Sequence, residues 1–402
     1  MKVMTVVGAR PNFMKVAPIL RAIRRHNSEQ PDADQISYVL VHTGQHYDQA
    51  MSDSFFADLD IPKPDVHLAV GSGSHAVQTA EIMRRFEAVL LKEEPDVLVV
   101  AGDVNSTIAC ALVAAKIAYS GSGLRPQIAH VEAGLRSFDR TMPEEINRIL
   151  TDALADVLFV TEESGIENLL HEGVSKEKIH FVGNTMIDSL LEFKEKADGS
   201  SILQRLGLTM KTAREEIADY ALLTLHRPAN VDSEDSFREI LEGLRELSKE
   251  TPIVFPAHPR TKRSIAEFHL ESYFRPDGSS SNSGIQLTEP LGYLDFLCLM
   301  KHAKLVITDS GGIQEETTCL GVPCVTVREN TERPVTLVGG ANILAGVRAE
   351  GIRDAVRRQL HRRGPIDIPP KWDGLASSRI VKALLESNAR QSPASLLSQH
   401  ST

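Results

Sequence analysis

Short apolar runs alternate with amphipathic stretches along most of the chain, a pattern typical of a parallel sheet covered by helices on both faces. In the first half, the runs that predict buried strands are Lys2–Val7, Ser37–Val41, Asp96–Ala101, Gln127–Val131 and Val157–Val160. The stretches between them that predict helices include Lys15–Arg25, Ala76–Lys92 and Thr107–Ala118. A further helix is expected to begin near Pro143, because the N–H that proline lacks has no partner in a first helical turn anyway.

The same alternation starts again after residue 185. The apolar runs that predict strands there are Tyr220–Thr224, Ile253–Pro256, Gly284–Leu287, Lys304–Thr308 and Pro323–Val327. The helical stretches include Ser236–Glu250, Tyr293–Lys301 and Ile313–Leu320. Because 402 residues are too many for one hydrophobic core, we expect two domains. The predicted fold class is α/β, with two doubly wound Rossmann-like domains at residues 1–185 and 186–371.

Two segments do not fit this alternation. Pro276–Gly284 is rich in serine and glycine, a composition that cannot form a core and that predicts a loop. The last helical pattern, Ser377–Ser387, follows Trp372–Gly374 and could belong to either domain. We expect a helix over residues 375–390, fraying after Ser387, and a flexible tail over 391–402.

Composition excludes several classes of protein. The formal net charge of −10 argues against binding to nucleic acid or to an anionic membrane surface. No apolar run approaches membrane-spanning length, and the chain begins with a predicted strand rather than a signal segment. The four cysteines show no C-x-x-C spacing and are typical of small core residues in a reducing compartment. We therefore expect a cytoplasmic location.

The most informative stretch is His130–Arg136 followed by Pro143–Arg148, which places acidic residues and two arginines after a buried strand. Carboxylates beside cations at the end of a strand favour acid/base chemistry on an anionic substrate. The alternative is that Glu144 and Glu145 merely complement the dipole of the helix that begins at Pro143. This segment alone does not decide between the two interpretations.

Two more strand ends in the first half carry charged side chains. Asp103 follows a strand, where its carboxylate is well placed for a ligand, although Asp103 or Asn105 could instead cap the next helix. Arg10 lies in a strand-to-helix turn whose backbone N–H groups, with Lys15, could hold a phosphate. The alternative for Arg10 and Lys15 is ordinary surface charge.

In the second half, Thr308–Glu316 carries the strongest signal. Ser310, Gly311 and Gly312 let the backbone approach an oxyanion at a helix N-terminus, and Glu316 could bind ribose hydroxyls. The alternative is a glycine-rich turn with a capping box. His226-Arg227 ends another strand and offers a proton carrier and a cation, and Glu332-Arg333 adds a further cation.

Other motifs are absent from the sequence. No G-x-G-x-x-G follows a predicted strand, so there is no nicotinamide fingerprint, and there is no Walker A, H-E-x-x-H or G-x-S-x-G motif. No group of histidines and cysteines has zinc spacing, so no metal site is predicted.

Taken together, the motifs resemble those of the non-hydrolysing UDP-N-acetylglucosamine 2-epimerases over nearly the whole chain. The segments that carry the resemblance are Gly8–Pro11, Gly44–His46, Gly102–Asp103, His130–Arg136, Pro143–Arg148, Gly183–Thr185, His226–Arg227, Thr308–Gly312 with Glu315–Glu316, Thr331–Pro334 and Trp372–Gly374. Each is weak alone, but the ordered set is specific.

The resemblance implies the two-domain GT-B architecture of nucleotide-sugar glycosyltransferases, with the substrate in the cleft and the last helix crossing back to the first domain. It also implies a homodimer. The implied substrate is a UDP-N-acetylhexosamine, and the reaction interconverts UDP-N-acetylglucosamine and UDP-N-acetylmannosamine by elimination and re-addition of UDP through 2-acetamidoglucal. No metal or redox cofactor is implied, and the product would supply surface polysaccharide synthesis.

By the same resemblance, Asp103, Glu132 and Glu144 carry the chemistry and His226 assists them. Which carboxylate serves which face of C2 stays open. The substrate-binding positions are Arg10, Lys15, Arg148, Phe296, Ser310, Gly311, Gly312, Glu316 and Arg333, with Phe296 near the uracil.

Some positions depart from the family pattern. Asn12 stands where many members have Glu, Pro228-Ala229 follows His226-Arg227, and Leu291 replaces a common Gln. Bacterial members are often activated by a second UDP-N-acetylglucosamine, and Gln45, His46 and His258 match that regulatory site. Glu81 and Pro228 stand where arginines are expected, which leaves such regulation open.

Four other functions stay open from sequence. These are a 2-epimerase for a modified sugar such as a diacetamido-uronic acid nucleotide, a hydrolysing 2-epimerase, a glycosyltransferase of the same fold and a nucleotide-sugar sensor. Three carboxylates near the sugar are more than a transferase or a sensor requires.

Overall fold

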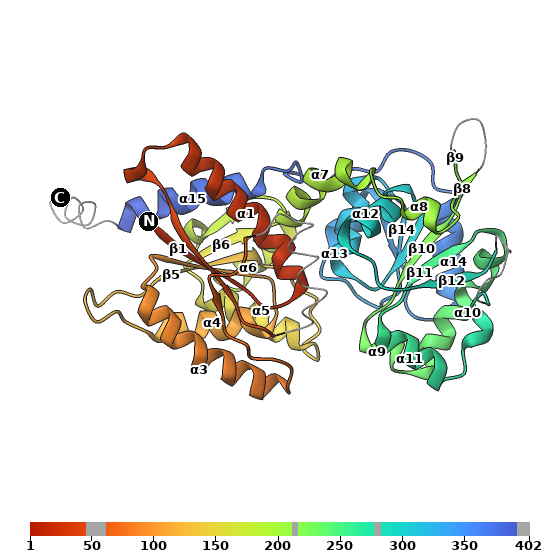
Figure 1. The fold of residues 1–402 in the computed structure, drawn as a ribbon, viewed down its shortest axis with the longest axis horizontal. Helices are drawn as coiled ribbons and strands as arrows, with labels where there is room; N and C mark the ends of the chain where they lie inside the picture. Colours follow the sequence, from red (N-terminus) through yellow and green to blue (C-terminus); the bar gives the residue numbers. More distant parts are fainter. Residues whose placement is uncertain (46–61, 211–215, 277–282, 392–402) are drawn as a thin grey trace. The chain divides into compact units, whose positions relative to one another are not determined.

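The computed structural model describes residues 1–45, 62–210, 216–276 and 283–391. The chain divides into two compact units, Met1–Ser189 with Pro370–Thr402, and Leu190–Pro369 (Figure 1). The sequence places the boundary at residue 185, slightly before this division. None of the described helices is long and apolar enough to cross a membrane.

The first unit is built on a seven-stranded parallel sheet in the order β3-β2-β1-β4-β5-β6-β7. The strand order reverses between β1 and β4, which is where open α/β sheets bind ligands beyond the carboxyl ends of their strands. The strands are β1 (Lys2–Val7), β2 (Ser37–His42), β3 (Val66–His67), β4 (Val97–Ala101), β5 (Gln127–Ala133), β6 (Val157–Val160) and β7 (Ile179–Phe181).

Helices cover both faces of this sheet. Helix α3 packs on α4 and α4 on α5 on one face, while α1 and α15 pack together on the other (Figure 1). The helices are α1 (Arg10–Glu29), α3 (His75–Glu93), α4 (Asn105–Lys116), α5 (Pro143–Leu154), α6 (Glu163–His171), α7 (Thr185–Ala197), which runs across the division between the units, and α15 (Ala376–Gln391). Apolar side chains of the strands and of α3 and α4 form the core on one side of the sheet.

The last helix belongs to the first unit. The Asp188 carboxylate accepts hydrogen bonds from the Ala376 N–H at 3.1 Å and the Ser377 N–H at 2.7 Å, at the start of α15. Trp372 Nε1 donates to the Thr161 carbonyl at 3.0 Å. Helix α15 continues to Gln391, so the expectation of fraying directly after Ser387 is wrong. The residues that follow Ser387 include good helix formers, which explains the continuation.

The second unit has a six-stranded parallel sheet in the order β12-β11-β10-β13-β14-β15 and a short antiparallel pair, β8-β9. The strands are β8 (Thr209–Met210), β9 (Glu216–Ile217), β10 (Ala221–Thr224), β11 (Ile253–Pro256), β12 (Ile285–Thr288), β13 (Leu305–Thr308), β14 (Cys324–Thr326) and β15 (Asn342–Leu344). The helices are α8 (Ile202–Arg205), α9 (Pro228–Val231), α10 (Glu234–Glu250), α11 (Pro259–Glu267), α12 (Tyr293–His302), α13 (Gly311–Leu320) and α14 (Ala349–Leu360).

Both sheets are parallel and flanked by helices, which confirms the predicted α/β class with two Rossmann-like domains. Two helix starts differ from the prediction in ways that matter for the site. Helix α1 begins at Arg10 rather than Lys15, and α4 begins at Asn105 rather than Thr107. Most of the segment expected as a loop, Pro276–Gly284, lies outside the described residues, at 277–282.

Candidate active site

Glu132 occupies a bulge at the end of β5. The pairing of β5 with β6 shifts register between Val131 and Ala133, and Glu132 between them has a φ of +72°. Such a conformation is costly for a residue with a side chain, and bulges next to active sites re-aim side chains. The Glu132 carboxylate is buried and forms an ion pair with the ammonium of Lys15 on α1. The bulge therefore directs a buried carboxylate against a buried cation.

Gly102 makes room for this ion pair. Its φ is +68°, and a Cβ added there would lie 2.8 Å from Lys15 Nζ and 3.4 Å from Glu132 Oε2. Its N–H donates to the Val131 carbonyl at 3.0 Å, which holds the end of β4 against β5. A residue without a side chain is therefore required where the carboxylate and the ammonium meet.

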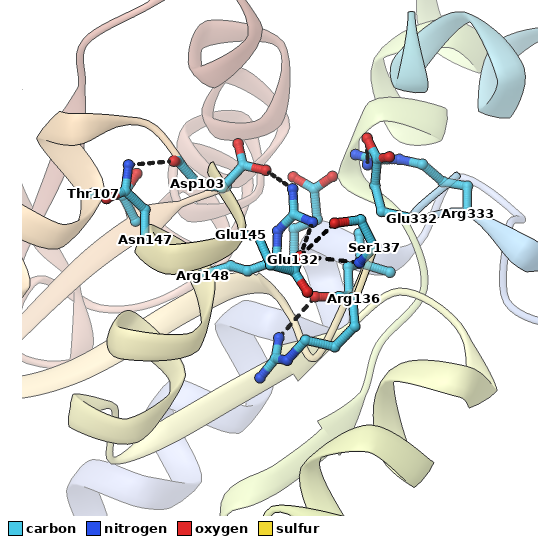
Figure 2. Close-up of polar contacts among 12 residues, drawn as sticks. Asp103, Thr107, Glu132, Arg136, Ser137, Glu145, Asn147, Arg148, Glu332 and Arg333 are labelled. Atoms are coloured by element: carbon cyan, nitrogen blue, oxygen red, sulfur yellow. Dashed lines mark hydrogen bonds and ion pairs between the residues drawn. The ribbon is translucent and has the colours of Figure 1, made fainter. Parts of the chain in front are cut away.

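Asp103 follows Gly102 and is held by Arg148 (Figure 2). The buried Arg148 guanidinium pairs through Nη2 with Asp103 and donates through Nη1 to Glu145 Oε2 at 2.7 Å. The Asp103 side chain keeps a quarter of its surface exposed. The alternative that Asp103 or Asn105 caps α4 is wrong, because the cap residue is Val104 and no side chain caps it. Arg148 thus bridges two carboxylates and is itself buried.

Glu145 serves the loop before its own helix. Its carboxylate accepts from the Ser137 N–H at 3.0 Å, the Ser137 hydroxyl at 2.9 Å and the Phe138 N–H at 2.9 Å (Figure 2). Glu145 therefore fixes the backbone of the Ser137–Phe138 loop, in addition to any interaction with the dipole of α5. Glu144, the next residue before it, is exposed in the first turn of α5.

A chain of charged side chains, buried except for Glu172 at its end, is centred on Asp152. Asp152 on α5 accepts from His130 Nδ1 at 2.6 Å, from the Gly134 N–H at 3.0 Å and from Arg136 Nη1 at 2.7 Å. Arg136 also pairs with Glu172 at 2.6 Å. Burial alone would raise the pKa of Asp152, but His130 and Arg136 hold that pKa below its usual range. Arg136, read from the sequence as a cation beside an anionic substrate, is fully engaged inside the protein.

The turn between β1 and α1 differs from the phosphate-binding turn that the sequence suggested. Asn12 Oδ1 accepts from the N–H groups of Gly8 at 3.2 Å and Ala9 at 2.9 Å. Asn12 Nδ2 donates to the Ala101 carbonyl at 2.8 Å. Two of the backbone N–H groups of this turn are therefore occupied by Asn12. Arg10 is the first residue of α1.

In the second unit, a fully buried aspartate organises the ends of β10 and β13. Asp309 Oδ1 lies 2.7 Å from His226 Nδ1, and its carboxylate also accepts from the N–H groups of His226 and Arg227 and from Asn230 Nδ2. Burial would raise the pKa of Asp309, but His226 and these backbone donors lower it. The His226 side chain is 59% exposed, so its other nitrogen can meet a ligand.

The start of α13 lies beside a second group of paired charges. A Cβ on Gly311 would lie 2.9 Å from Glu332 Oε1 and 3.1 Å from the Arg333 guanidinium carbon. Arg333 donates to Glu332 at 2.7 Å and to Glu315 at 3.2 Å. Burial opposes the ionisation of Glu332, yet Arg333 and Arg328 lower its pKa. The capping-box alternative is wrong, because no side chain caps the Ser310 end of α13.

The remaining candidates of the second unit lie around α12 and α13. Ser310, Gly311 and Gly312 are partly exposed at the N-terminus of α13. Glu316 is buried further along α13, with Tyr293 Oη 3.4 Å from its Oε1. Phe296 is partly exposed on α12.

The residues matched to a regulatory site have structural partners. Gln45 Oε1 accepts from the Ser106 N–H at 3.0 Å and the Ser106 hydroxyl at 2.7 Å. His258 caps α11 by accepting from the Arg260 N–H at 3.3 Å. Glu81 pairs with Arg84 and Arg85 on its own helix. His46 lies outside the described residues.

A family model described as UDP-N-acetylglucosamine 2-epimerase matches residues 29–385. The chain belongs to this family. A UDP-N-acetylglucosamine 2-epimerase of Methanocaldococcus jannaschii is 43% identical over 386 residues, covering 96% of this chain and 99% of the relative. A UDP-2,3-diacetamido-2,3-dideoxy-D-glucuronate 2-epimerase of Pseudomonas aeruginosa is 39% identical with the same coverage.

Solved structures of the 2-epimerase family match both units. The crystal structure of the Methanocaldococcus jannaschii enzyme with UDP-GlcNAc and UDP has a TM-score of 0.83 at 42% identity, covering 96% of this chain and all of that one. The Neisseria meningitidis enzyme bound to UDP-GlcNAc has a TM-score of 0.79 at 29% identity, with the same coverage. The likeness to these family structures therefore extends over nearly the whole chain, as the resemblance of the motifs did.

Proposed function

We propose that the protein interconverts UDP-N-acetylglucosamine and UDP-N-acetylmannosamine by eliminating UDP and adding it back, without a metal or redox cofactor. The observation that carries the proposal is the pair of carboxylates on either side of Gly102. Asp103 follows Gly102 in the chain, and Glu132 Oε2 lies 3.4 Å from the position of a Cβ on Gly102. Family membership supplies the substrate class.

The chemistry needs carboxylates near the sugar for two reasons. The C2 proton is not acidic enough for direct removal, so the bond from C1 to the UDP oxygen breaks first and positive character builds at C1. Carboxylates stabilise that charge. One of them then takes the C2 proton as the C1=C2 double bond of 2-acetamidoglucal forms. We propose Asp103, Glu132 and Glu144 for these tasks.

Epimerisation is completed when the steps are reversed with the proton added to the opposite face of C2. A carboxylic acid delivers a proton to C2 from the opposite side, and the UDP oxygen bonds to C1 again. Proton delivery from a group that exchanges with water would introduce solvent hydrogen at C2. In this proposal Lys15, which forms an ion pair with Glu132, holds that carboxylate in place beside the sugar.

Groups of the second unit are proposed to bind UDP. The partly exposed N–H groups at the start of α13 and the nearby Arg333 suit a diphosphate. We propose that His226, oriented by Asp309, donates to the departing oxygen. Glu316 and Phe296 are proposed for the ribose and the uracil. We further propose that the enzyme works as a homodimer and supplies surface polysaccharide synthesis.

One relative favours a second candidate. The 39% identical Pseudomonas aeruginosa protein is named for a diacetamido-glucuronate nucleotide. The same elimination chemistry would apply to that substrate, which differs at C3 and C6 of the sugar.

The deciding experiment is proton NMR of the purified protein with UDP-N-acetylglucosamine in D2O. We expect an anomeric signal of UDP-N-acetylmannosamine and deuterium at C2 of the sugar. Accumulation of UDP with free N-acetylmannosamine would indicate a hydrolysing enzyme instead. No change with this substrate but turnover of the diacetamido-uronic acid nucleotide would establish the second candidate.

A further inference from the structure

His130 lies inside the central sheet, buried from solvent, and both of its ring nitrogens have hydrogen-bond partners within the protein. It is 0% exposed on β5, with Nδ1 2.6 Å from Asp152 Oδ1 and Nε2 2.8 Å from the carbonyl oxygen of Gly102. That carbonyl belongs to the peptide bond that joins Gly102 to Asp103. The imidazole therefore connects a buried carboxylate to the backbone directly before a proposed catalytic residue.

We propose that His130 is a positioning residue, held as a doubly protonated imidazolium, that fixes the Gly102–Asp103 peptide and thereby aims the Asp103 carboxylate. The inference rests on the proposed function, because its catalytic consequence is measured on the epimerisation. It concerns a residue that does not touch the substrate and acts through Asp103.

The hydrogen-bond partners require both protons. A backbone carbonyl oxygen can only accept, so Nε2 must carry a hydrogen. Asp152 Oδ2 accepts from the Gly134 N–H and pairs with Arg136, and this environment keeps the carboxylate ionised. An ionised carboxylate can only accept as well, so Nδ1 also carries a hydrogen.

The surrounding charges balance a buried imidazolium. Along the chain of contacts, positive His130 meets negative Asp152, which meets positive Arg136, which meets negative Glu172. Each buried charge thus has an opposite neighbour, which is the condition under which charges are tolerated in a protein interior. The arrangement gives the imidazolium a fixed ring orientation, since both of its N–H directions are occupied.

Asp103 is then held at three points. His130 holds the carbonyl of the peptide before it, Asn147 Nδ2 donates to its own carbonyl oxygen at 2.9 Å, and Arg148 pairs with its carboxylate. Figure 2 shows the contacts of Asn147 and Arg148. Gly102 has a φ of +68° and no side chain of its own to restrain it, and the His130 hydrogen bond restrains that peptide plane. Small errors in the placement of a catalytic group are costly in rate.

The protonation state can be measured without any activity assay. The whole protein, labelled with ¹⁵N in histidine, is examined by long-range ¹H–¹⁵N NMR at pH 7.5, and the His130 signals are assigned by their loss in His130→Gln. We expect two protonated ring nitrogens. His42 is an internal contrast, because burial and the nearby His67 lower its pKa to about 4 and keep it neutral. A neutral His130 would overturn the proposal.

The kinetic test compares Asp152 with Asp156. Each of these aspartates accepts a backbone N–H from one end of β5 and pairs with an arginine. Asp152 holds the Gly134 N–H and Arg136 at the carboxyl end of β5, and Asp156 holds the Ile128 N–H at 2.9 Å and Arg125 at its amino end. Only Asp152 contacts His130. We expect Asp152→Asn and His130→Gln to lower kcat about 100-fold with KM within about threefold. Asp156→Asn should destabilise the fold yet leave kcat within about twofold.

The outcomes separate this inference from the proposed function. The kcat of each variant is divided by its folded fraction, which is taken from urea unfolding at the assay temperature. Equal kcat values for His130→Gln, Asp152→Asn and Asp156→Asn would show a merely structural role and overturn the inference. A wild type that does not turn over UDP-N-acetylglucosamine would overturn the proposed function and the inference with it. An active wild type with a neutral His130 would overturn the inference alone.

Discussion

Arg148 Nη1 donates to Glu145 Oε2 at 2.7 Å, while the other end of the same guanidinium holds Asp103. One buried cation therefore connects a carboxylate that shapes the Ser137–Phe138 backbone with one that is proposed to act on the sugar. The sequence assigned Arg148 to substrate binding. The contacts give it a second task, which is to fix one carboxylate with respect to another.

Replacing Arg148 by Met should damage both stability and turnover. Removing one member of a buried charge network leaves two carboxylates without their cation, which is expected to cost about 3 kcal/mol of unfolding free energy. We expect kcat to fall about 100-fold, because Asp103 loses its restraint. Urea unfolding and the NMR epimerisation assay measure the two effects. Arg125→Met, which removes a more exposed ion pair with Asp156, is the control and should leave kcat unchanged.

Gly102→Ala should reduce activity more than its effect on stability explains. A side chain at a φ of +68° costs about 1 kcal/mol, and the new Cβ would also displace Lys15 from Glu132. Gly123→Ala is a matched control, because its φ is +70° and nothing lies within 4 Å of the added Cβ. We expect similar small losses of stability from the backbone, but a fall in kcat of about tenfold or more only for Gly102→Ala. Equal kcat values would show that the ion pair tolerates the methyl group.

Asp309→Asn should act through His226. The substitution removes the carboxylate that orients the imidazole and that accepts from the His226 and Arg227 backbone, so kcat should fall about tenfold. A double-mutant cycle with His226→Asn checks the pathway. Strong non-additivity in kcat is expected, because His226→Asn removes the imidazole that Asp309→Asn only misorients. Additive effects would indicate that Asp309 and His226 act independently.

The pH dependence of stability should carry a contribution from His42. Its folded-state pKa of about 4 lies below the ordinary value of 6.5, because the ring is buried. A depressed histidine pKa contributes stability that is present above pH 6.5 and is lost as the pH falls toward 4. Relative to His42→Leu, the wild type should lose about 2 kcal/mol of unfolding free energy between pH 7 and pH 4.5. A pH profile of stability for His42→Leu that runs parallel to the wild-type profile would contradict the assignment.

Much of the fold could be predicted from the sequence because the central strands are continuous apolar runs. Lys2–Val7, Val157–Val160 and Ile253–Pro256 were placed with their observed bounds. The short edge strands β3, β7 and β15 were missed, since two or three residues are too few to show a pattern. Their positions depend on pairing with a neighbouring strand rather than on their own composition.

The candidate carboxylates Asp103 and Glu132 could be located because they lie at strand ends, but their partners could not. Asp152 looks like an ordinary polar residue in the sequence, and Asp309 lies in a motif noted for its neighbours Ser310, Gly311 and Gly312. Only tertiary contacts bring these aspartates to His130 and His226. One partner did leave a readable signal. Asn12 lies at the third residue of its helix, where a side chain can reach back to the N–H groups of the preceding turn.

The chain leaves the first unit after Ser189 and returns to it at Pro370. The two ends of this excursion are close together in the first unit, because Asp188 accepts from the N–H groups of Ala376 and Ser377. The second unit is therefore an insertion within the first rather than a domain appended to it. No single cut of the chain can separate two complete domains, because Met1–Ser189 and Pro370–Thr402 together form the first unit, and removing Leu190–Pro369 would cut helix α7 within its own length.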